Sequence, residues 1–373
     1  MATIVQVVGA RPNYVKVAAL WRAVATDAPD VTQHLVDTGQ HARDDMSGTF
    51  RRELGLPDAG WRLGVQSADR LSQIAAVATA VADVLVRVTP DVVVVVGDVN
   101  STLGAAVAAA SLGLPVAHVE AGLRSGDRSM PEELNRVATD RLSDLLFTTS
   151  RDAGENLARE GVPPSRVHFV GNVMIDTLVH HLPEAVFDRV AARFAVERGA
   201  YAVCTLHRPS NVDVATTLAR VLDELGHLGR RMPVVFPVHP RTCDRLRAFG
   251  LAVPAHGVHV SDPLGYLDFL SLVRHAALVV TDSGGLQEEA IVLGVPCVTL
   301  RANTERPVTL EGGANRLADP AAGGLADIAM AALRAPVLPA PPELWDGRAA
   351  ARVVGVMRRT GVLPRAMPAA VQA

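Results

Sequence analysis

The sequence has few aromatic residues, few cysteines and no surplus of positive charge, and each shortage excludes a class of protein. Aromatic side chains make up 4% of the 373 residues, the net charge is −3, and no run is rich in Lys and Arg. Nucleic-acid binding through base stacking and phosphate neutralisation is therefore not expected. Cys204, Cys243 and Cys297 have neither metal-ligand spacing nor the even number of a disulfide framework, which indicates a reducing compartment.

Long apolar stretches are also missing. The N-terminal segment "MATIVQVVGARPNY" has no basic region followed by a longer apolar core, and no stretch of the sequence reaches the length of a membrane span. We therefore expect a soluble, cytoplasmic protein with no membrane partner.

What remains is an ordinary globular composition, with 49% hydrophobic and 20% charged residues. A chain of 373 residues exceeds the size at which one hydrophobic core keeps growing, so two domains are expected.

Short apolar runs alternate with stretches of helical length along most of the chain. The first half contains six such runs: "TIVQVVG", "HLVDTG", "VVVVVG", "VAHVE", "LLFTTS" and "VHFVG". After residue 172 come five more: "YAVCTLH", "PVVFPVH", "VHVSD", "LVVTDS" and "CVTL". Strands that alternate with helices form parallel sheets. The pattern predicts an α/β fold of two Rossmann-like domains whose parallel sheets face a central cleft.

Acidic residues follow two of the apolar runs in the first half. Asp98 comes just after five valines, and Glu120 ends the run "VAHVE". Because ligands bind beyond the carboxyl ends of parallel strands, the two carboxylates are expected to share one sheet edge. Glu132 and Glu133 follow in "SMPEELNR", where Ser129 and Glu132 have the spacing of a helix capping box. Carboxylates gathered in one place repel each other, a cost that structural roles rarely require, so the group favours catalysis over capping.

The stretch "VVGARPNYVK" predicts a strand, a glycine turn and a helix that begins near Pro12. The amide groups of such a helix start bind anions, and Arg11 and Lys16 lie beside it. The alternative is an ordinary surface Arg and Lys. The sequence has no G-x-G-x-x-G after this strand and no P-loop, so neither a dinucleotide cofactor nor a nucleoside triphosphate is predicted.

A second strand-to-helix turn, "VVTDSGGLQEEA", has the same character. Ser283, Gly284 and Gly285 leave backbone amides uncovered, which suits a diphosphate, and Glu289 one turn later could accept hydrogen bonds from ribose hydroxyls. Ser283 could alternatively serve only as an N-cap, with the glutamates complementing the helix dipole.

Two histidines stand at equivalent strand ends in the second half. His207 ends "YAVCTLH" and His239 ends "VVFPVH". One histidine at a strand end is most often structural, but a pair of them favours proton transfer in the site.

Seven of these stretches together resemble one family, the non-hydrolysing UDP-N-acetylglucosamine 2-epimerases. They occur in the family's order: "GARPNYVK", "DTGQH", "GDVNST", "HVEAGLRSGDRSMPEELNR", "TLHRPSNVD", "FPVHPRT" and "TDSGGLQEEA…LGVPCVTLRANTERPVT". The resemblance implies a GT-B-type fold and a homodimer that needs no metal and no cofactor. It also implies an N-terminal domain at residues 1–172 with the catalytic carboxylates, a UDP-binding domain at 173–350, and a C-terminal helix and tail at 351–373 that cross back to the first domain.

The resemblance also implies the reaction, which interconverts UDP-GlcNAc and UDP-ManNAc through elimination of UDP to a 2-acetamidoglucal and re-addition. Carried over position by position, the catalytic residues are Asp98, Glu120, Glu132 and His207. The residues implied to bind the UDP-sugar are Arg11, Lys16, His239, Ser283, Gly284, Gly285, Glu289 and Arg306. Alternatives are an epimerase of a related 2,3-diacetamido or uronic acid sugar, a GT-B glycosyltransferase that uses a UDP-sugar donor, the hydrolysing branch of epimerases, and a sugar-nucleotide sensor without activity.

Overall fold

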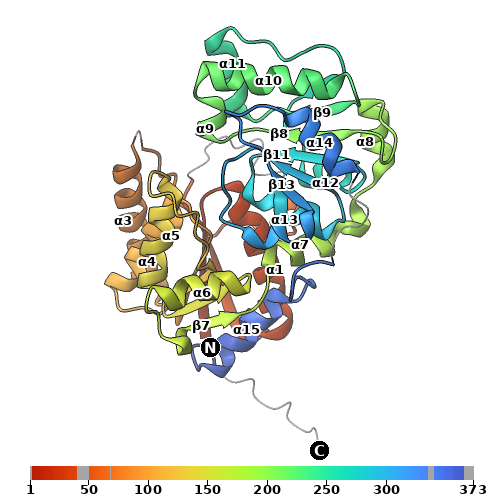
Figure 1. The fold of residues 1–373 in the computed structure, drawn as a ribbon. Helices are drawn as coiled ribbons and strands as arrows, with labels where there is room; N and C mark the ends of the chain where they lie inside the picture. Colours follow the sequence, from red (N-terminus) through yellow and green to blue (C-terminus); the bar gives the residue numbers. More distant parts are fainter. Residues whose placement is uncertain (1, 40–49, 68, 335–339, 365–373) are drawn as a thin grey trace, which may run out of the picture. The chain divides into compact units, whose positions relative to one another are not determined.

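The computed structural model describes residues 2–39, 50–67, 69–334 and 340–364. The chain forms two compact units, one made of Met1–Thr177 with Glu343–Ala373 and the other of Leu178–Pro342 (Figure 1). Gln40 and His41 of the "DTGQH" motif lie outside the described residues.

The first unit is built on a seven-stranded sheet in the order β3-β2-β1-β4-β5-β6-β7. All of its strand pairs are parallel. The strands are β1 (Ala2–Val8), β2 (Val31–Asp37), β3 (Trp61–Arg62), β4 (Val92–Val96), β5 (Val116–Ala121), β6 (Leu145–Thr148) and β7 (Val167–Phe169). Each of the six predicted runs overlaps a strand, although β2 begins three residues before its run. The two-residue edge strand β3 was not predicted, because it contains no apolar run.

Helices follow the strands of this unit as the alternation predicts. They are α1 (Arg11–Asp27), α3 (Arg70–Val88), α4 (Asn100–Ser111), α5 (Pro131–Leu142), α6 (Arg151–Arg159), the short η1 (Pro164–Arg166), α7 (Val173–His181) and α15 (Ala349–Arg359). Val93 and Val95 of β4 share a buried cluster with Val77 and Val81 of α3. Val92 and Val94 are buried as well, so both faces of the valine strand are covered, as the unbroken run predicted.

The C-terminal helix α15 completes the first unit by packing against α1 (Figure 1). Two backbone amides at its start, those of Ala349 and Ala350, donate to the carboxylate of Asp176 on α7 at 3.0 and 2.7 Å. Just before the helix, the indole Nε1 of Trp345 donates to the carbonyl of Thr149 at 2.8 Å. These bonds anchor residues near 350 to residues near 150–176 of the same unit.

Helix α3 does not meet the expectation that no stretch could span a membrane. By length and composition it is the one helix within the described ranges that qualifies, with a mean hydropathy of 1.6 over an 18-residue window. The sequence did not predict this helix as a span, because Arg70, Asp83 and Arg87 interrupt its apolar run. In the fold the helix connects β3 to β4 and packs against α4. It therefore serves as a covering helix of the sheet, and its exposed side carries apolar residues such as Leu71 and Val86 beside polar ones such as Asp83.

The second unit has a six-stranded parallel sheet in the order β10-β9-β8-β11-β12-β13. The strands are β8 (Ala202–Thr205), β9 (Val234–Pro237), β10 (Val258–Ser261), β11 (Leu278–Thr281), β12 (Cys297–Thr299) and β13 (Asn315–Leu317). The five predicted runs are all strands. The edge strand β13 was missed because Asn315 and Arg316 break its hydrophobic pattern.

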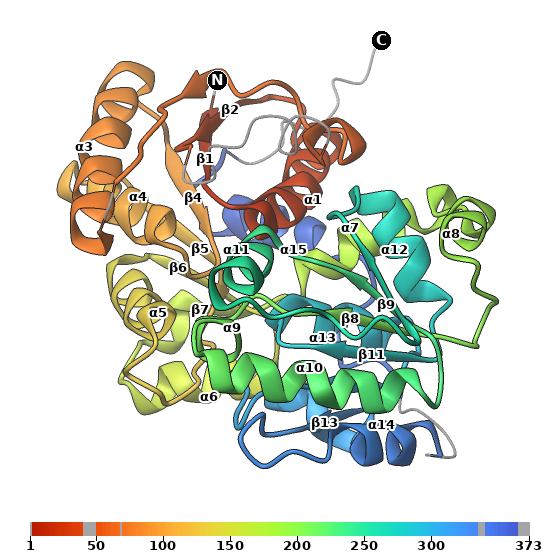
Figure 2. The same ribbon diagram turned by 90° about the horizontal axis from the view of Figure 1, so that it is seen from above.

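Helices cover both faces of this second sheet (Figure 2). Ala202 and Cys204 of β8 pack with α10 and α14, whereas Val203 between them packs with α8, α12 and α13. The helical segments are η2 (Leu182–Glu184), α8 (Phe187–Phe194), α9 (Pro209–Val212), α10 (Ala215–Gly229), α11 (Pro240–Phe249), α12 (Tyr266–Arg274), α13 (Gly284–Val292), η3 (Pro307–Gly313) and α14 (Leu325–Leu333).

Candidate active site

Asp98 lies just beyond the carboxyl end of β4, at the position that the valine run predicted. Its Oδ2 atom is 2.5 Å from a guanidinium nitrogen of Arg136 on α5. Its backbone carbonyl accepts a hydrogen bond of 2.8 Å from the side-chain amide of Asn135. The Asp98 carboxyl group remains about one quarter exposed, so it is held by α5 without being sealed from a ligand.

Glu120 is positioned by a backbone irregularity in β5. The sequence predicted that it would end a strand, but it lies within β5, where the register with β6 shifts between Val119 and Ala121. Its φ of +72° is in the left-handed region, which costs a residue other than glycine about 1–3 kcal/mol. The buried Glu120 carboxylate forms an ion pair with the equally buried ammonium of Lys16.

Gly97 brings these two acidic positions to one sheet edge. A Cβ atom on Gly97 would lie 2.9 Å from Lys16 Nζ and 3.2 Å from Glu120 Oε2, and the φ of Gly97 is +69°. Only glycine tolerates both the turn and this close approach. Since Asp98 is the next residue, the Lys16–Glu120 pair contacts the turn that carries Asp98.

The start of helix α5 corrects the capping interpretation of Glu132. The N-cap residue is Met130, and Ser129 donates its hydroxyl to Asp127 Oδ1 at 2.6 Å instead of capping the helix. No capping box forms, because Pro131 begins the helix two residues after Ser129 and places Glu132 at the second helical position. Glu132 is half-buried and lies one turn before Arg136, the residue that binds Asp98.

Glu133 holds the loop before α5 in place. Its carboxylate accepts bonds of 2.9 Å from the backbone amides of Ser125 and Gly126 and binds Arg136 at 2.8 Å. Burial raises the pKa of Glu133, but these donors and the Arg136 charge outweigh it and leave the pKa below its usual value. Of the two adjacent glutamates, Glu133 therefore has the structural role.

The start of α1 is less open to anions than the sequence suggested. The side-chain oxygen of Asn13 accepts bonds from the amides of Gly9 and Ala10 at 3.3 and 3.0 Å. Lys16 faces Glu120, and the guanidinium of Arg11 lies 5.9 Å from the centre of the Phe50 ring. The amides of Gly9 and Ala10, just before the first helical residue, thus already have a partner within the chain.

In the second unit, His207 and a buried aspartate form a pair. His207 Nδ1 is 2.8 Å from Asp282 Oδ1, and the fully buried Asp282 also accepts bonds from the amides of His207 and Arg208 and from Asn211 Nδ2. Burial raises the pKa of Asp282, but the His207 charge and these bonds hold it below its usual value. An ionised Asp282 fixes a proton on His207 Nδ1, so Nε2 is the atom that can exchange protons.

His239 lies next to this pair. It is the N-cap of α11, where its Nδ1 accepts the amide of Arg241 at 3.2 Å. The ring centres of His239 and His207 are 5.4 Å apart. The two histidines at equivalent strand ends are therefore neighbours, as their positions in the sequence suggested.

The helix start of α13 combines amide groups with a cation. Ser283 is its N-cap, without a side-chain cap bond, and Gly284 is its first residue. A Cβ on Gly284 would collide with the guanidinium of Arg306, so this glycine makes room for the arginine. Arg306 pairs with Glu305 and lies 2.9 Å from Glu288. The helix dipole and the Arg306 charge both favour an anion here.

Glu289, one turn further along α13, is a buried acid beside another acid. Burial, together with the neighbouring Glu288, raises its pKa to about 8. At neutral pH the carboxyl group is therefore mainly protonated in the ligand-free protein.

Asp282 and Arg136 were not among the predicted site residues, although both stand inside the motifs "TDSGGLQEEA" and "HVEAGLRSGDRSMPEELNR". Asp282 precedes Ser283 at the end of β11, and Arg136 follows Glu132 by one helical turn. Strand-end position and helical spacing were the signals that could have identified them.

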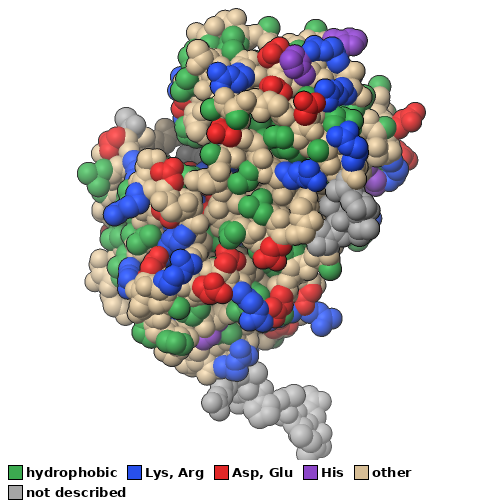
Figure 3. All heavy atoms as spheres, in the orientation of Figure 1, with side chains coloured by type: hydrophobic (Ala, Val, Ile, Leu, Met, Phe, Trp, Pro, Cys, Tyr) green, Lys and Arg blue, Asp and Glu red, His purple; other side chains and the backbone are tan. Residues whose placement is uncertain are grey.

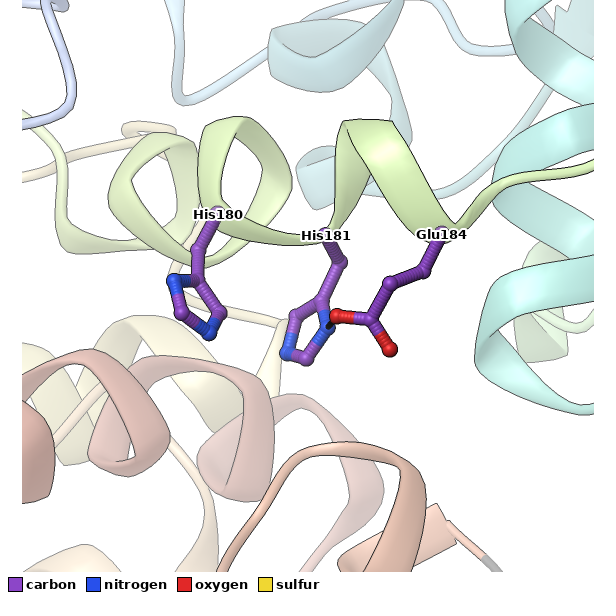
Figure 4. A group of neighbouring side chains, drawn as sticks. All are labelled: His180, His181 and Glu184. Atoms are coloured by element: carbon purple, nitrogen blue, oxygen red, sulfur yellow. Dashed lines mark hydrogen bonds and ion pairs between the residues drawn. The ribbon is translucent and has the colours of Figure 1, made fainter.

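Among the described residues, one group of side chains is close enough to share a metal ion: His180, His181 and Glu184 (Figure 4). His181 Nδ1 is 3.0 Å from Glu184 Oε1, and the ring also contacts Tyr266 edge-on. These contacts fix the end of α7, and none of the three belongs to the predicted catalytic or binding sets.

Two parallel α/β units with acids at the strand ends of one and a glycine-rich helix start in the other define the GT-B-like class of nucleotide-sugar enzymes. The sequence profile described as UDP-N-acetylglucosamine 2-epimerase matches residues 23–358. The UDP-N-acetylglucosamine 2-epimerase of Methanocaldococcus jannaschii is 40% identical over 319 residues, which cover 83% of this chain and 87% of the relative. The UDP-2,3-diacetamido-2,3-dideoxy-D-glucuronate 2-epimerase of Pseudomonas aeruginosa is 37% identical over 317 residues, covering 84% and 87%.

A solved structure agrees along nearly the whole length. The crystal structure of the M. jannaschii UDP-GlcNAc 2-epimerase in complex with UDP-GlcNAc and UDP superposes with a TM-score of 0.90 and 36% identity, covering 96% of this chain and 99% of that one. The chain belongs to the UDP-N-acetylglucosamine 2-epimerase family.

Proposed function

We propose that this protein is an isomerase that interconverts UDP-GlcNAc and UDP-ManNAc. The observation that carries the proposal is the Gly97 turn, where Asp98 and the strained Glu120 are held at the ends of neighbouring strands with Arg136 and Lys16 as counter-charges. Family membership and the structural match to an epimerase that contains UDP-GlcNAc support the same substrate.

The proposed reaction expels UDP first, because the C2 proton of a 2-acetamido sugar is too weakly acidic for direct removal. Departure of UDP leaves an oxocarbenium-like sugar, which carboxylates stabilise. Loss of the C2 proton gives 2-acetamidoglucal, and return of a proton to the other face followed by re-addition of UDP gives the epimer. Two proton-handling groups are needed. We assign this chemistry to four residues: Asp98, Glu120, Glu132 and His207.

The second unit supplies most of the proposed groups for the nucleotide. The amides of Gly284 and Gly285 and the Arg306 charge suit the diphosphate, since they combine a helix dipole with a guanidinium. Glu289 suits the ribose hydroxyls. The remaining proposed contacts are Ser283, His239, Arg11 and Lys16. Because Lys16 pairs with Glu120, its assigned role is at the sugar end of the substrate.

A related sugar is the second candidate substrate. The P. aeruginosa relative, at 37% identity, is named for a 2,3-diacetamido uronic acid, and the same elimination would act on that compound. The two candidates differ only at C3 and C6 of the sugar, away from the bond that breaks.

We also propose that the protein is cytoplasmic and forms a homodimer through helix α3. Leu71 and Val86 on this helix are 76% and 61% exposed. Hydrophobic side chains are visible at the surface over α3, at the left edge of the space-filling view (Figure 3). Burial of such a face by a second copy removes apolar area from water. Light scattering should give twice the mass of one chain, and Leu71→Glu should return it to one.

The activity is tested by proton NMR of the purified protein with UDP-GlcNAc in D₂O. Deuterium at C2 together with UDP-ManNAc establishes the epimerase. Free ManNAc with UDP would assign it to the hydrolysing branch. No exchange with UDP-GlcNAc, but exchange with the 2,3-diacetamido uronic acid substrate, would favour the second candidate.

A further inference from the structure

His118 is a buried ionisable group that the proposed reaction does not use. It lies on β5, two residues before Glu120, and its side chain is completely inaccessible to solvent. Both ring nitrogens make hydrogen bonds, Nδ1 with Asp140 Oδ1 at 2.6 Å and Nε2 with the carbonyl oxygen of Gly97 at 2.8 Å.

The two partners determine where the protons are. The Gly97 carbonyl can only accept, so Nε2 must carry a proton. Asp140 accepts at its other oxygen from the Gly122 amide at 3.1 Å and from Arg124 at 2.7 Å. Burial raises the pKa of Asp140, but His118 and Arg124 lower it below its usual value, so the group is a carboxylate. A carboxylate with acceptor oxygens only requires a proton on Nδ1 as well.

We propose that His118 carries a proton on each ring nitrogen, as its two acceptor partners require, and that it is a positioning residue that clamps the peptide before Asp98. The charge of His118 is compensated by Asp140. Arg124 binds Asp140 at 2.7 Å and Glu160 at 2.7 Å, so the four groups alternate in charge. The charged groups on the surrounding elements are Asp140, Arg136 and Glu133 of α5, Arg124 after β5, Asp98 after β4 and Lys16 of α1.

The clamp acts on both sides of one residue. The amide of Gly97 donates to the Val119 carbonyl at 3.0 Å, while its own carbonyl accepts from His118. Residues 118 and 119 thus fix the turn that carries Asp98, and the same strand segment continues directly into the strained Glu120. One buried cation therefore sets the separation of the two carboxylates. This catalytic consequence rests on the proposed function, whereas the protonation state does not.

The protonation state is tested first, by NMR of the full-length protein with ¹⁵N-labelled histidine rings. His118→Asn identifies the signal, because it removes one histidine of twelve. We expect His118 to show two protonated ring nitrogens at pH 8. A signal typical of a neutral tautomer at pH 7 would overturn the proposal.

The positioning role is tested with two variants that each keep half of the clamp. In His118→Asn the amide nitrogen replaces Nδ1 and the bond to Gly97 is lost, whereas in His118→Gln it replaces Nε2 and the Asp140 bond is lost. A displacement of about 1 Å at a reacting group can lower the rate 10²-fold, so kcat should fall at least about tenfold in His118→Asn and less in His118→Gln. KM and the affinity for UDP should change less than about threefold, because most of the proposed nucleotide contacts are on the other unit and His118 contacts none of them.

The control is His168→Gln on β7, which is separated from β5 by β6 in the same sheet, and this variant should leave kcat unchanged. Equal kcat in wild type and both His118 variants, at full folding by circular dichroism, would overturn the positioning role. If His118→Asn fails to fold, His118→Gln assigns the NMR signal in its place, and its kcat still tests the positioning role. A wild-type protein inert toward UDP-sugars would refute the proposed function and leave the NMR result standing.

Discussion

His207 Nδ1 lies 2.8 Å from Asp282 Oδ1, so this nitrogen of the ring faces a buried carboxylate and the proposed proton transfer is left to Nε2. Because the buried Asp282 also accepts three backbone or amide bonds, it cannot turn away from the histidine. The pair therefore orients the ring and fixes its tautomer, as a carboxylate does for histidine in hydrolase triads.

Asp282→Asn should lower kcat by between about 10²- and 10⁴-fold, because the amide no longer fixes the proton on His207 Nδ1. Steady-state kinetics with UDP-GlcNAc measures the effect. The control is Asp223→Asn on α10, whose carboxyl is 74% exposed and which should keep full activity. Normal kcat in a folded Asp282→Asn protein would refute the role of the pair.

UDP binding should release nearly one proton at pH 7. Glu289 has a pKa of about 8 in the free protein and is protonated there, whereas a carboxylate that accepts ribose hydroxyls is ionised. Calorimetry in buffers of different ionisation enthalpy measures the release, which should shrink above pH 9, where the free group is already ionised. Glu289→Gln should abolish it. Binding enthalpies that are identical in all buffers would contradict the assignment.

Gly97→Ala should impair activity more than its backbone strain explains. The added methyl group meets Lys16 and Glu120, and the positive φ adds about 1–2 kcal/mol of strain. Gly113→Ala is the matched control, because Gly113 has a φ of +68° and nothing within 4 Å. Urea unfolding should show a loss in both variants, and kcat should fall only in Gly97→Ala. An equal fall of kcat in both variants would mean that Gly97→Ala acts only through lost stability.

Ser129→Ala should change the free energy of unfolding by less than about 0.5 kcal/mol, since Ser129 does not cap α5. Glu133→Gln should cost about 1–3 kcal/mol, because its carboxylate binds two amides and Arg136. Urea denaturation of both variants measures the difference. A loss of about 1 kcal/mol of unfolding free energy in Ser129→Ala would instead support the interpretation of Ser129 as a helix cap.

The fold could be predicted from the sequence because its strands are buried on both faces and so appear as unbroken apolar runs, of which the five valines of β4 are the clearest. Strands β3 and β13 lack that signal, since each is a short edge strand that contains an arginine. In the site, the placement of Asp98 followed from the end of its strand.

The partners of the acidic residues could not be predicted in the same way. Lys16 and Glu120 are 104 residues apart, and the β-bulge that turns Glu120 toward Lys16 leaves no local pattern in "VAHVEAG". The Ser129 spacing matched a capping box, but Pro131 moved the helix start. Sequence spacing identifies candidates, whereas tertiary contacts decide which acid is structural and which is accessible.

The bonds that anchor α15 mean that the first unit can finish folding only after the second unit has been synthesised. The first unit needs Trp345, Ala349 and Ala350 to satisfy Thr149 and Asp176, yet these residues are synthesised after the whole second unit. The N-terminal sheet therefore leaves the ribosome without its last covering helix and waits for some 165 further residues. A nascent chain that stalls within the second unit leaves uncovered the face of α1 against which α15 packs in the folded protein.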